Sequence, residues 1–207
     1  MNRRDVLKGL TLSLGYAVAT PTALSMLQSC AEKSDKWNTV FLNEAEKNMV
    51  FHLVDIILPK TDTPGGLDLN LPQFIDLMCS DVLYPADQEL FHQGSEVFAK
   101  RFRTKFNKDL QKATREEILT LFAFYFDKDT SESAAIKKLL SFKVGQVPGS
   151  EKDDYKMYKC LTNIRSFSLL GYFTSEKIGT EVLTFDPIPG VWKPCIPVGE
   201  VGNAWTL

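Results

Sequence analysis

The sequence predicts an all-α protein: a single helical domain of about six or seven helices, followed by an extended tail rich in Pro, Gly and Trp. Two observations predict this fold class. Apolar residues recur at the three-to-four-residue spacing of amphipathic helices from about residue 43 to residue 183. Strict alternation of apolar and polar residues, which is typical of strands, hardly occurs. The chain has 207 residues, which is enough to build one sizeable hydrophobic core.

The first helix is expected to begin after Asn43 and to end before Pro59. Asn43 is followed three residues later by Glu46, which is the spacing of a capping box. The apolar stripe behind this cap consists of Val50, Phe51, Val54, Ile57 and Leu58. An N-cap, an apolar stripe and a closing proline together predict one complete amphipathic helix.

The segment 59–66 predicts a defined loop because it is dominated by Pro, Thr, Asp and Gly. Within it, Pro64-Gly65 suits a type II turn. Pro72 then suits the first residue of a second helix. The apolar pattern of that helix stops near Pro85 and consists of Phe74, Ile75, Leu77, Met78, Val82 and Leu83.

The remaining helices follow at short intervals along the chain. The longest should turn Phe98 and Phe102 inward and its basic residues outward. A second capping box is formed by Thr114 and Glu117. The expected ranges are 87–106, 114–126, 131–140, 153–171 and 175–183. Ser131 is expected to cap the helix over 131–140, and Asp153 or Asp154 the helix over 153–171.

The last segment, residues 184–207, differs in kind from the rest. Its density of Pro and Gly excludes a regular helix or a central strand. It also contains Phe185, Trp192 and Trp205, which make it too apolar for a disordered tail. We therefore expect it to lie extended on a surface, either that of its own helices or that of a partner protein.

The N-terminal residues are typical of a targeting segment. Arg3 and Arg4 are followed by Leu7 and Lys8, and no charged residue occurs from 9 to 31. This arrangement resembles a twin-arginine export motif. The uncharged run contains Gly, Thr, Ser and Pro, so it is less hydrophobic than a membrane-spanning helix usually is. An ordinary secretory signal or a single anchor helix is the alternative interpretation.

Cys30 follows Leu-Gln-Ser, which resembles a lipoprotein cleavage box. On this interpretation, residues 1–29 are a signal peptide and Cys30 carries a lipid that tethers the protein to a membrane. Residues 30–42 then form a spacer, and residues 43–207 form the helical domain. The protein is expected on the periplasmic side of a bacterial cell envelope. The alternative is that Cys30 is simply a cysteine near the end of a helix.

Composition excludes several classes of function. The formal net charge of −2 becomes more negative once the basic leader is removed, so a nucleic-acid partner is not expected. His52 and His92 are the only histidines, and their positions do not suit a metal site. Beyond the leader, three cysteines allow at most one disulfide, whose pairing the sequence does not reveal: Cys79, Cys160 and Cys195.

The sequence also lacks recognisable catalytic motifs. Its glycines do not form a dinucleotide fingerprint or a phosphate-binding loop. Neither the covalent haem signature nor a nucleophile elbow is present. The paired carboxylates Glu116-Glu117 and Asp153-Asp154 fall in expected first helical turns, where the helix dipole favours negative charge. We therefore expect no catalytic, cofactor-binding or metal-binding residues in this chain.

Two stretches carry a family pattern. The first is ILPKTDTPGG at 57–66, followed by LPQFID at 71–76. The second is GYFTSEK at 171–177, continuing to FDPIPGVW at 185–192 and Cys195. Together with the leader, these stretches resemble the gluconate 2-dehydrogenase subunit 3 family. One departure is Pro194, where the family commonly has Gly.

This resemblance implies a non-catalytic small subunit with a large partner. The partner would be an FAD-dependent flavoprotein of the glucose-methanol-choline oxidoreductase type, which oxidises sugars or polyols, while a separate cytochrome c takes the electrons. FAD is then expected in the partner, and no cofactor in this chain. The small subunit would supply the export signal for the folded partner and stay bound to it. The expected contact residues are Pro64, Gly65, Phe173, Trp192 and Trp205, with the tail around Trp192 as a main contact.

Two other functions remain open from the sequence. A free-standing cell-envelope enzyme could use carboxylates such as Asp62 or Asp186, although turn chemistry explains both residues more simply. A structural envelope lipoprotein without a redox partner is the other possibility. Flavin that copurifies with the chain would separate an escort subunit from the second alternative.

Overall fold

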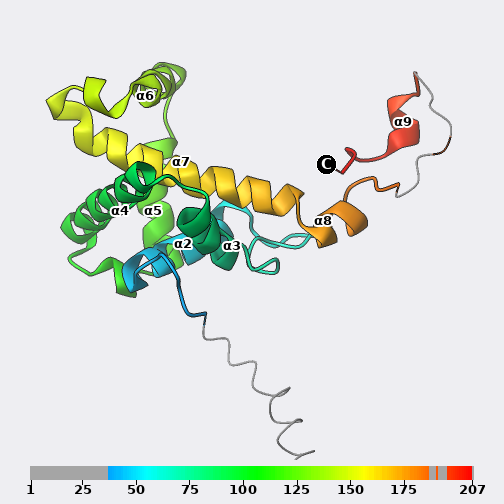
Figure 1. Cartoon of the computed structure of the whole chain (residues 1–207), viewed down its shortest axis with the longest axis horizontal. Helices are drawn as coiled ribbons and strands as arrows, with labels where there is room; N and C mark the ends of the chain where they lie inside the picture. The colour runs from blue at the N-terminus through cyan, green and yellow to red at the C-terminus, as the bar shows by residue number, and fades with distance from the viewer. Residues whose placement is uncertain (1–36, 187–189, 191–194, 207) are drawn as a thin grey trace, which may run out of the picture. The chain divides into compact units, whose positions relative to one another are not determined.

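The structure, a computed structural model, describes residues 37–186, 190 and 195–206. The chain divides into two compact units, Met1–Asn38 and Thr39–Leu207, and all of the helices described below belong to the second unit. This described part contains eight α-helices and no named strand, so the predicted all-α fold is confirmed (Figure 1). None of the described helices combines the length and the apolar character that crossing a membrane requires.

Helix α2 (Glu44–Ile57) has the predicted cap and ends before Pro59, as predicted. The Asn43 side chain accepts the backbone N–H of Glu46 at 3.0 Å, and the Glu46 carboxylate accepts the backbone N–H of Asn43 at 3.0 Å. This reciprocal pair satisfies two donors that a helix start leaves without partners. The predicted capping box is therefore confirmed.

The residues just before α2 are fixed to helix α3 (Leu71–Asp81) by a buried carboxylate. Asp76 is 1% exposed, and it accepts three consecutive backbone N–H groups, those of Val40 (2.8 Å), Phe41 (3.0 Å) and Leu42 (2.9 Å). Leu42 is itself buried. Residues 40–42, which the sequence analysis placed in the spacer, are thus bonded to the helical domain.

Glu46 links the start of α2 to the next helix, α4 (Pro85–Phe106). Its second carboxylate oxygen lies 2.8 Å from Nδ1 of His92 and accepts the hydroxyl of Ser95. The His92 ring also stacks on Phe41, with ring centroids 4.3 Å apart. Every oxygen of this buried carboxylate therefore has a partner, which a buried charge requires.

The boundary between α3 and α4 corrects one prediction. Pro85 was expected to end the preceding apolar pattern, with the next helix starting near Asp87. Instead α3 ends at Asp81 and Pro85 is the first residue of α4. The physical reason is that proline has no N–H to lose in a first turn, and its fixed φ suits a helix start.

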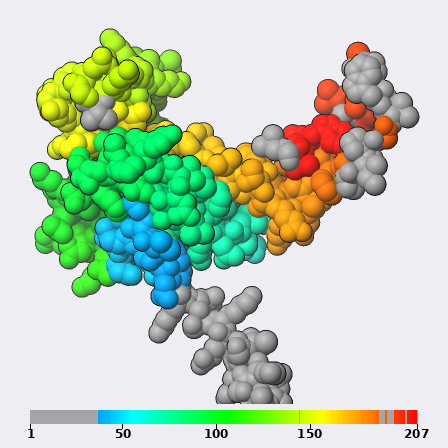
Figure 2. Space-filling model, viewed as in Figure 1, coloured from blue at the N-terminus to red at the C-terminus, as the bar shows by residue number. Residues whose placement is uncertain are grey.

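The core lies between α4 and the long helix α7 (Lys152–Phe173), which pack against each other more extensively than any other pair of described elements. Figure 2 shows α4 in green beside the yellow start of α7. Gly94 permits this approach because a Cβ there would lie 2.3 Å from the backbone oxygen of Lys156. The largest fully buried side chains are Phe91, Phe98, Phe102, Met49, Leu53, Ile75, Ile118, Leu121, Met157, Leu161, Ile164 and Ile178.

Helix α5 (Arg115–Phe126) begins with the predicted capping box of Thr114 and Glu117, which is confirmed. Helix α6 (Thr130–Ser141) corrects the predicted cap. Asp129, not Ser131, is its N-cap and accepts the backbone N–H of Glu132 at 2.8 Å. The Ser131 hydroxyl donates to the same Asp129 carboxylate. A carboxylate is the stronger acceptor at a helix start because it also meets the positive end of the dipole.

Three short 3-10 helices connect the longer elements: Leu110–Lys112, Val144–Gln146 and Gly149–Glu151. The last of these 3-10 helices leads directly into α7. The N-cap of α7 is Glu151, whereas Asp153 and Asp154, the predicted caps, lie within the first turn, so that prediction is wrong. A 3-10 turn supplies the backbone geometry that a side-chain cap would otherwise have to enforce.

The last described elements are helix α8 (Glu176–Glu181), which lies in the predicted range and is capped by Ser175, and a four-residue helix, α9 (Val198–Val201). Thr184 and Trp205 form an isolated parallel β-bridge. The tail therefore contains a helical turn and one bridge among its described residues. Its extended course elsewhere stays a prediction, since residues 187–189, 191–194 and 207 lie outside the described part.

Candidate functional site

The loop of the first family pattern is built around two close-packed glycines. Gly65 N donates to the Asp68 carboxylate at 2.9 Å, and Gly66 N donates to the backbone oxygen of Leu58 at 2.8 Å. A Cβ on Gly65 would lie 2.7 Å from the backbone nitrogen of Lys60. The loop therefore folds back onto the end of α2 more closely than a larger residue allows.

The predicted type II turn at Pro64-Gly65 is wrong. Such a turn needs a positive φ at its second central residue, and among the described glycines only Gly202 has one. Gly65 is used for close approach of the backbone instead of for a left-handed conformation. Gly65 is therefore needed for close packing against the backbone of Lys60 and not for the predicted turn.

Charge supports the same loop geometry. The Asp68 carboxylate, which accepts the Gly65 N–H, also lies 3.2 Å from Nζ of Lys60. The Gly65 hydrogen bond, followed by Lys60, holds the pKa of Asp68 below its ordinary value. The ion pair between Lys60 and Asp68 therefore helps to fix the shape of the loop on its exposed side.

The C-terminal end of α7 is fixed against this loop and α3. The Tyr172 hydroxyl lies 3.3 Å from the hydroxyl oxygen of Thr63. A Cβ on Gly171 would lie 2.7 Å from the ring of Phe74 and 2.9 Å from Leu71, so only glycine fits there without a shift. The two family patterns, far apart in sequence, therefore meet in the folded chain.

The tail folds back onto α8 by specific contacts. Thr184 N donates to the backbone oxygen of Ala204 at 2.9 Å, and Thr206 N donates to the backbone oxygen of Thr184 at 3.1 Å. The Asn203 side chain donates to the backbone oxygen of Val182 at 2.7 Å. A Cβ on Gly179 would lie 2.8 Å from the Thr206 hydroxyl oxygen. These contacts place residues 203–206 beside α8.

An open hollow of about 420 Å³ lies between the end of α7, α8 and the tail. Phe173 and Phe185 line it, and both rings are about half exposed. Its other lining residues are Thr174, Ser175, Glu176, Gly179, Thr180 and Thr206. The side chain of Trp205, next to Thr206, is 52% exposed. We call Phe173, Phe185, Trp205 and this hollow the aromatic surface.

The predicted contact residues are divided by the fold. Phe173 and Trp205 belong to the aromatic surface, but Gly65 is buried and Pro64 is half-buried. Trp192, the leader residues Arg3, Arg4, Leu7 and Lys8, and the lipidation candidate Cys30 lie outside the described residues. Phe185 was missed as a contact residue, although its place in the second family pattern was the available signal.

The structure also places the other candidate chemical groups. Asp62 and Asp186 are both exposed. Among the described residues, no cluster of three or more His, Cys, Asp or Glu side chains is arranged to hold a metal ion. Cys79, Cys160 and Cys195 are free thiols in the described part, the first two buried and the third exposed. Burial, with Asp76 and Glu46 adding to it, raises the pKa of Cys79 to about 12.

One comparison with known proteins gives a match. The family model described as gluconate 2-dehydrogenase subunit 3 matches residues 44–190, which span every helix from α2 to α8. No curated protein and no solved structure matches the chain. The matched range includes the loop of the first pattern, the end of α7 and Phe185.

Proposed function

The chain belongs to the gluconate 2-dehydrogenase subunit 3 family, and on this premise we propose that it is a non-catalytic accessory subunit of a flavin-dependent sugar or polyol dehydrogenase. The family description itself supports membership of an oxidoreductase complex. In this proposal, FAD belongs to a large partner subunit of the glucose-methanol-choline type. A cytochrome c subunit of the same complex receives the electrons.

The observation that carries this proposal is the aromatic surface. Phe173 and Phe185 expose large rings at one open hollow, and Trp205 exposes a third ring next to the lining residue Thr206. All three belong to segments fixed by hydrogen bonds or helix packing. Clustered exposed aromatic side chains on a rigid support are typical of protein interfaces, where they contribute most of the binding energy. The aromatic surface therefore supports a bound protein partner better than it supports turnover of a small substrate.

The leader supports the escort part of the proposal. A twin-arginine signal suits cargo that has folded around its cofactor before export. A partner that carries FAD but lacks a signal would need a companion that supplies one, and Arg3 and Arg4 would provide it. Lipid on Cys30 would then hold the complex at the periplasmic side of a bacterial membrane.

Copurification tests the partner. The tagged full chain is isolated from its own cell envelope, and the visible spectrum and the composition of the eluate are measured. A flavoprotein in near-equal amount, with flavin absorbance, is the expected result. A colourless chain recovered alone would contradict the accessory-subunit proposal and leave a stand-alone envelope lipoprotein.

The aromatic surface is tested by substitution in the same assay. Phe173→Ser combined with Trp205→Ser is expected to reduce flavoprotein recovery at least about tenfold, because two exposed anchors are lost. Tyr84→Ser is the matched control, since Tyr84 is 78% exposed and does not line this hollow. Equal recovery with all variants would show that another surface binds the partner.

Export and anchoring are tested separately. Replacing both Arg3 and Arg4 with Lys is expected to leave the chain and its flavoprotein in the cytoplasm, because the twin-arginine route depends on the arginine pair. Cys30→Ala is expected to release the complex into the soluble envelope fraction. Membrane retention of the Cys30 variant would point to an uncleaved helix or to the partner as the anchor.

A further inference from the structure

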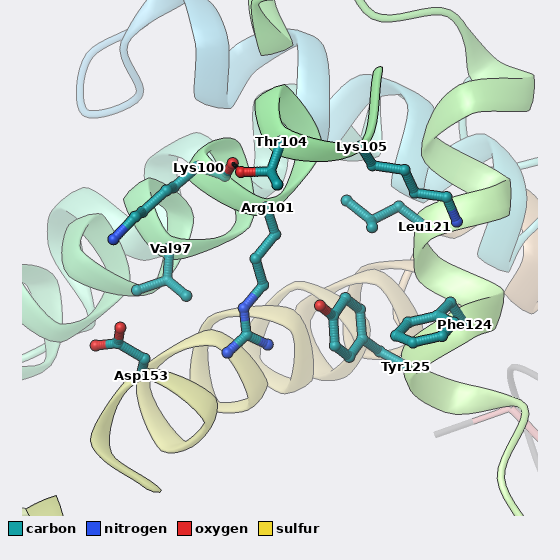
Figure 3. Close-up of a pocket in the computed structure, with 9 residues that line it drawn as sticks. All are labelled: Val97, Lys100, Arg101, Thr104, Lys105, Leu121, Phe124, Tyr125 and Asp153. Carbon is teal, nitrogen blue, oxygen red and sulfur yellow. Dashed lines mark hydrogen bonds between the residues drawn. The ribbon is translucent and has the colours of Figure 1, made fainter. Parts of the chain in front are cut away.

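A second hollow lies away from the aromatic surface, between α4 and α5. It has a volume of about 370 Å³ and is open to solvent. Figure 3 shows its lining: Val97, Lys100, Arg101, Thr104 and Lys105 from α4, Leu121, Phe124 and Tyr125 from α5, and Asp153 from the first turn of α7. We call it the α4–α5 groove.

Helical spacing explains why these residues share one groove. Within the α4 set, and again within the α5 set, each residue has another member three or four positions away, so each set lies on one face of its helix. Leu121 is buried and forms part of the floor, whereas Phe124 is 59% exposed. The groove therefore combines an apolar floor with an exposed aromatic ring.

The groove is lined by three basic side chains and by the acidic Asp153, and of the basic ones only Arg101 has an acidic partner among the described residues. Arg101 is bonded to Asp154 at 2.6 Å and lies over the Tyr125 ring. Within the described part of the chain, neither Lys100 nor Lys105 has a carboxylate within ion-pair distance. Lys105 lies 5.3 Å from the centre of the Phe124 ring. Two lysines thus stand free to meet negative charge beside an exposed apolar surface.

The hollow continues past the aromatic pair. Phe124 and Tyr125 also line a neighbouring hollow of about 380 Å³, whose charged residues are Lys128, Glu132, Glu151 and Asp154. Nζ of Lys128 lies 5.1 Å from the centre of the Phe124 ring. The two hollows therefore share Phe124 and Tyr125, and most of their other lining residues come from α4, α5, α6 and the start of α7. A polypeptide segment can contact both hollows.

We propose that the α4–α5 groove binds an acidic segment of the flavoprotein partner. The segment places carboxylates against Lys100 and Lys105 and a bulky apolar side chain on Phe124 and Tyr125. This inference rests on the proposed function, and it adds the chemistry of a second contact. The buried Leu121 and the exposed Phe124 ring match an apolar side chain, which a polypeptide supplies and a polyphosphate lacks.

Affinity measurements with the full chain test the groove. A double variant, Lys100→Glu with Lys105→Glu, is expected to weaken flavoprotein binding at least about tenfold and to reduce its dependence on salt, because two attractive charges become repulsive. The matched control is Lys112→Glu with Lys137→Glu, which makes the same charge change at exposed positions outside the groove. The control is expected to bind as the wild type does.

The apolar part of the groove is tested on one helix. Phe124→Ser is expected to weaken binding about tenfold, whereas Leu119→Ser, also exposed on α5, is expected to leave it unchanged. A photo-crosslinking residue at Thr104 is expected to label a stretch of the flavoprotein rich in Asp and Glu. Circular dichroism of each variant shows whether a loss of binding reflects a loss of folding.

The outcomes separate this inference from the proposed function. If the wild-type chain recovers no flavoprotein, the proposed function fails. If the wild type binds the flavoprotein and the charge-reversed variant binds it equally well, the groove proposal alone is overturned. Loss of binding to phosphatidylglycerol vesicles in that variant, with flavoprotein affinity unchanged, would also overturn it and assign the groove to lipid.

Discussion

The carboxylate of Asp76 accepts the backbone N–H of Leu42 at 2.9 Å inside the core, across 34 positions of sequence. The same carboxylate accepts the backbone N–H groups of Val40 and Phe41. Three consecutive backbone N–H groups therefore share one carboxylate as their acceptor. A buried carboxylate supports this arrangement because it has several lone pairs and carries no donor of its own. The segment that leads into α2 is therefore held by a residue of α3.

Replacing Asp76 should destabilise the domain. Asp76→Asn is expected to lower the free energy of unfolding by about 2 to 4 kcal/mol, because one side of the amide presents N–H groups to backbone N–H groups. Urea unfolding followed by circular dichroism measures the change. Asp81→Asn is the matched control, since Asp81 is exposed at the end of the same helix. A loss below about 0.5 kcal/mol for Asp76→Asn would contradict this role.

The close approach of α4 and α7 should make Gly94 intolerant of a side chain. Gly94→Ala is expected to cost about 1 to 3 kcal/mol, although alanine favours helix more than glycine does, because the new Cβ meets the Lys156 backbone oxygen. Thermal unfolding measures the loss. Gly145→Ala is the control, because a Cβ at Gly145 has nothing within 4 Å. Equal melting temperatures for the two variants would show that the helices can separate at little cost.

The three described cysteines should differ in reactivity. At pH 8, Cys195 is expected to react promptly with a thiol reagent, whereas Cys79 and Cys160 react only after unfolding, because burial raises the pKa of both thiols. Titration with a chromogenic disulfide, with and without denaturant, counts the reactive thiols. Cys195→Ala identifies the exposed one. Prompt reaction of any thiol in a native Cys30→Ala, Cys195→Ala double variant would contradict the burial of Cys79 and Cys160.

Glu117 should make part of the stability depend on acid pH. The Thr114 N–H, followed by Lys108, lowers the pKa of Glu117 in the folded chain. The unfolded chain then takes up this proton first as the pH falls, so the stability from Glu117 is present above its ordinary pKa of 4.5 and is lost below it. The stability gap between wild type and Glu117→Gln is therefore expected to narrow from pH 7 to pH 3.

Urea midpoints at several pH values measure this gap. Glu116→Gln is the control, because Glu116 is an exposed neighbour in the same helical turn. Glu116→Gln removes one negative charge near the helix start, as Glu117→Gln does, but it leaves the capping box of Thr114 and Glu117 intact. A gap for Glu117→Gln that stays constant from pH 7 to pH 3 would show that the carboxylate bond is absent in solution.

Local sequence patterns predicted most of the helices because their signals act over a few residues. Two helix starts were predicted from capping boxes, those of Asn43 with Glu46 and of Thr114 with Glu117, and the structure has both. The errors are local as well. Pro85 was interpreted as a stop although it is a start, and Asp129 rather than Ser131 caps α6, since neighbouring residues offered competing caps. Proline and short polar side chains suit both roles, so sequence alone leaves the choice open.

The candidate site was less predictable because its parts meet only in three dimensions. The sequence indicated Phe173 and Trp205 as contacts, but the hollow lined by Phe173 and Phe185 depends on Thr206 packing against Gly179. The α4–α5 groove left no sequence signal at all. Lys100 and Lys105 resembled ordinary solvated charges of one helix, and Phe124 resembled a core residue of another.

By itself, the sequence determined the all-α fold class, the family to which the chain belongs and the two capping boxes at Asn43 and Thr114. These depend on periodicity and on bonds between residues three or four positions apart. Only the tertiary structure decided that Asp76 fixes the entering chain, that Gly65 is buried, and that Phe124 stands exposed between two lysines. Burial and charge pairing are properties of surfaces brought together from distant segments, and no short-range pattern encodes which surfaces meet.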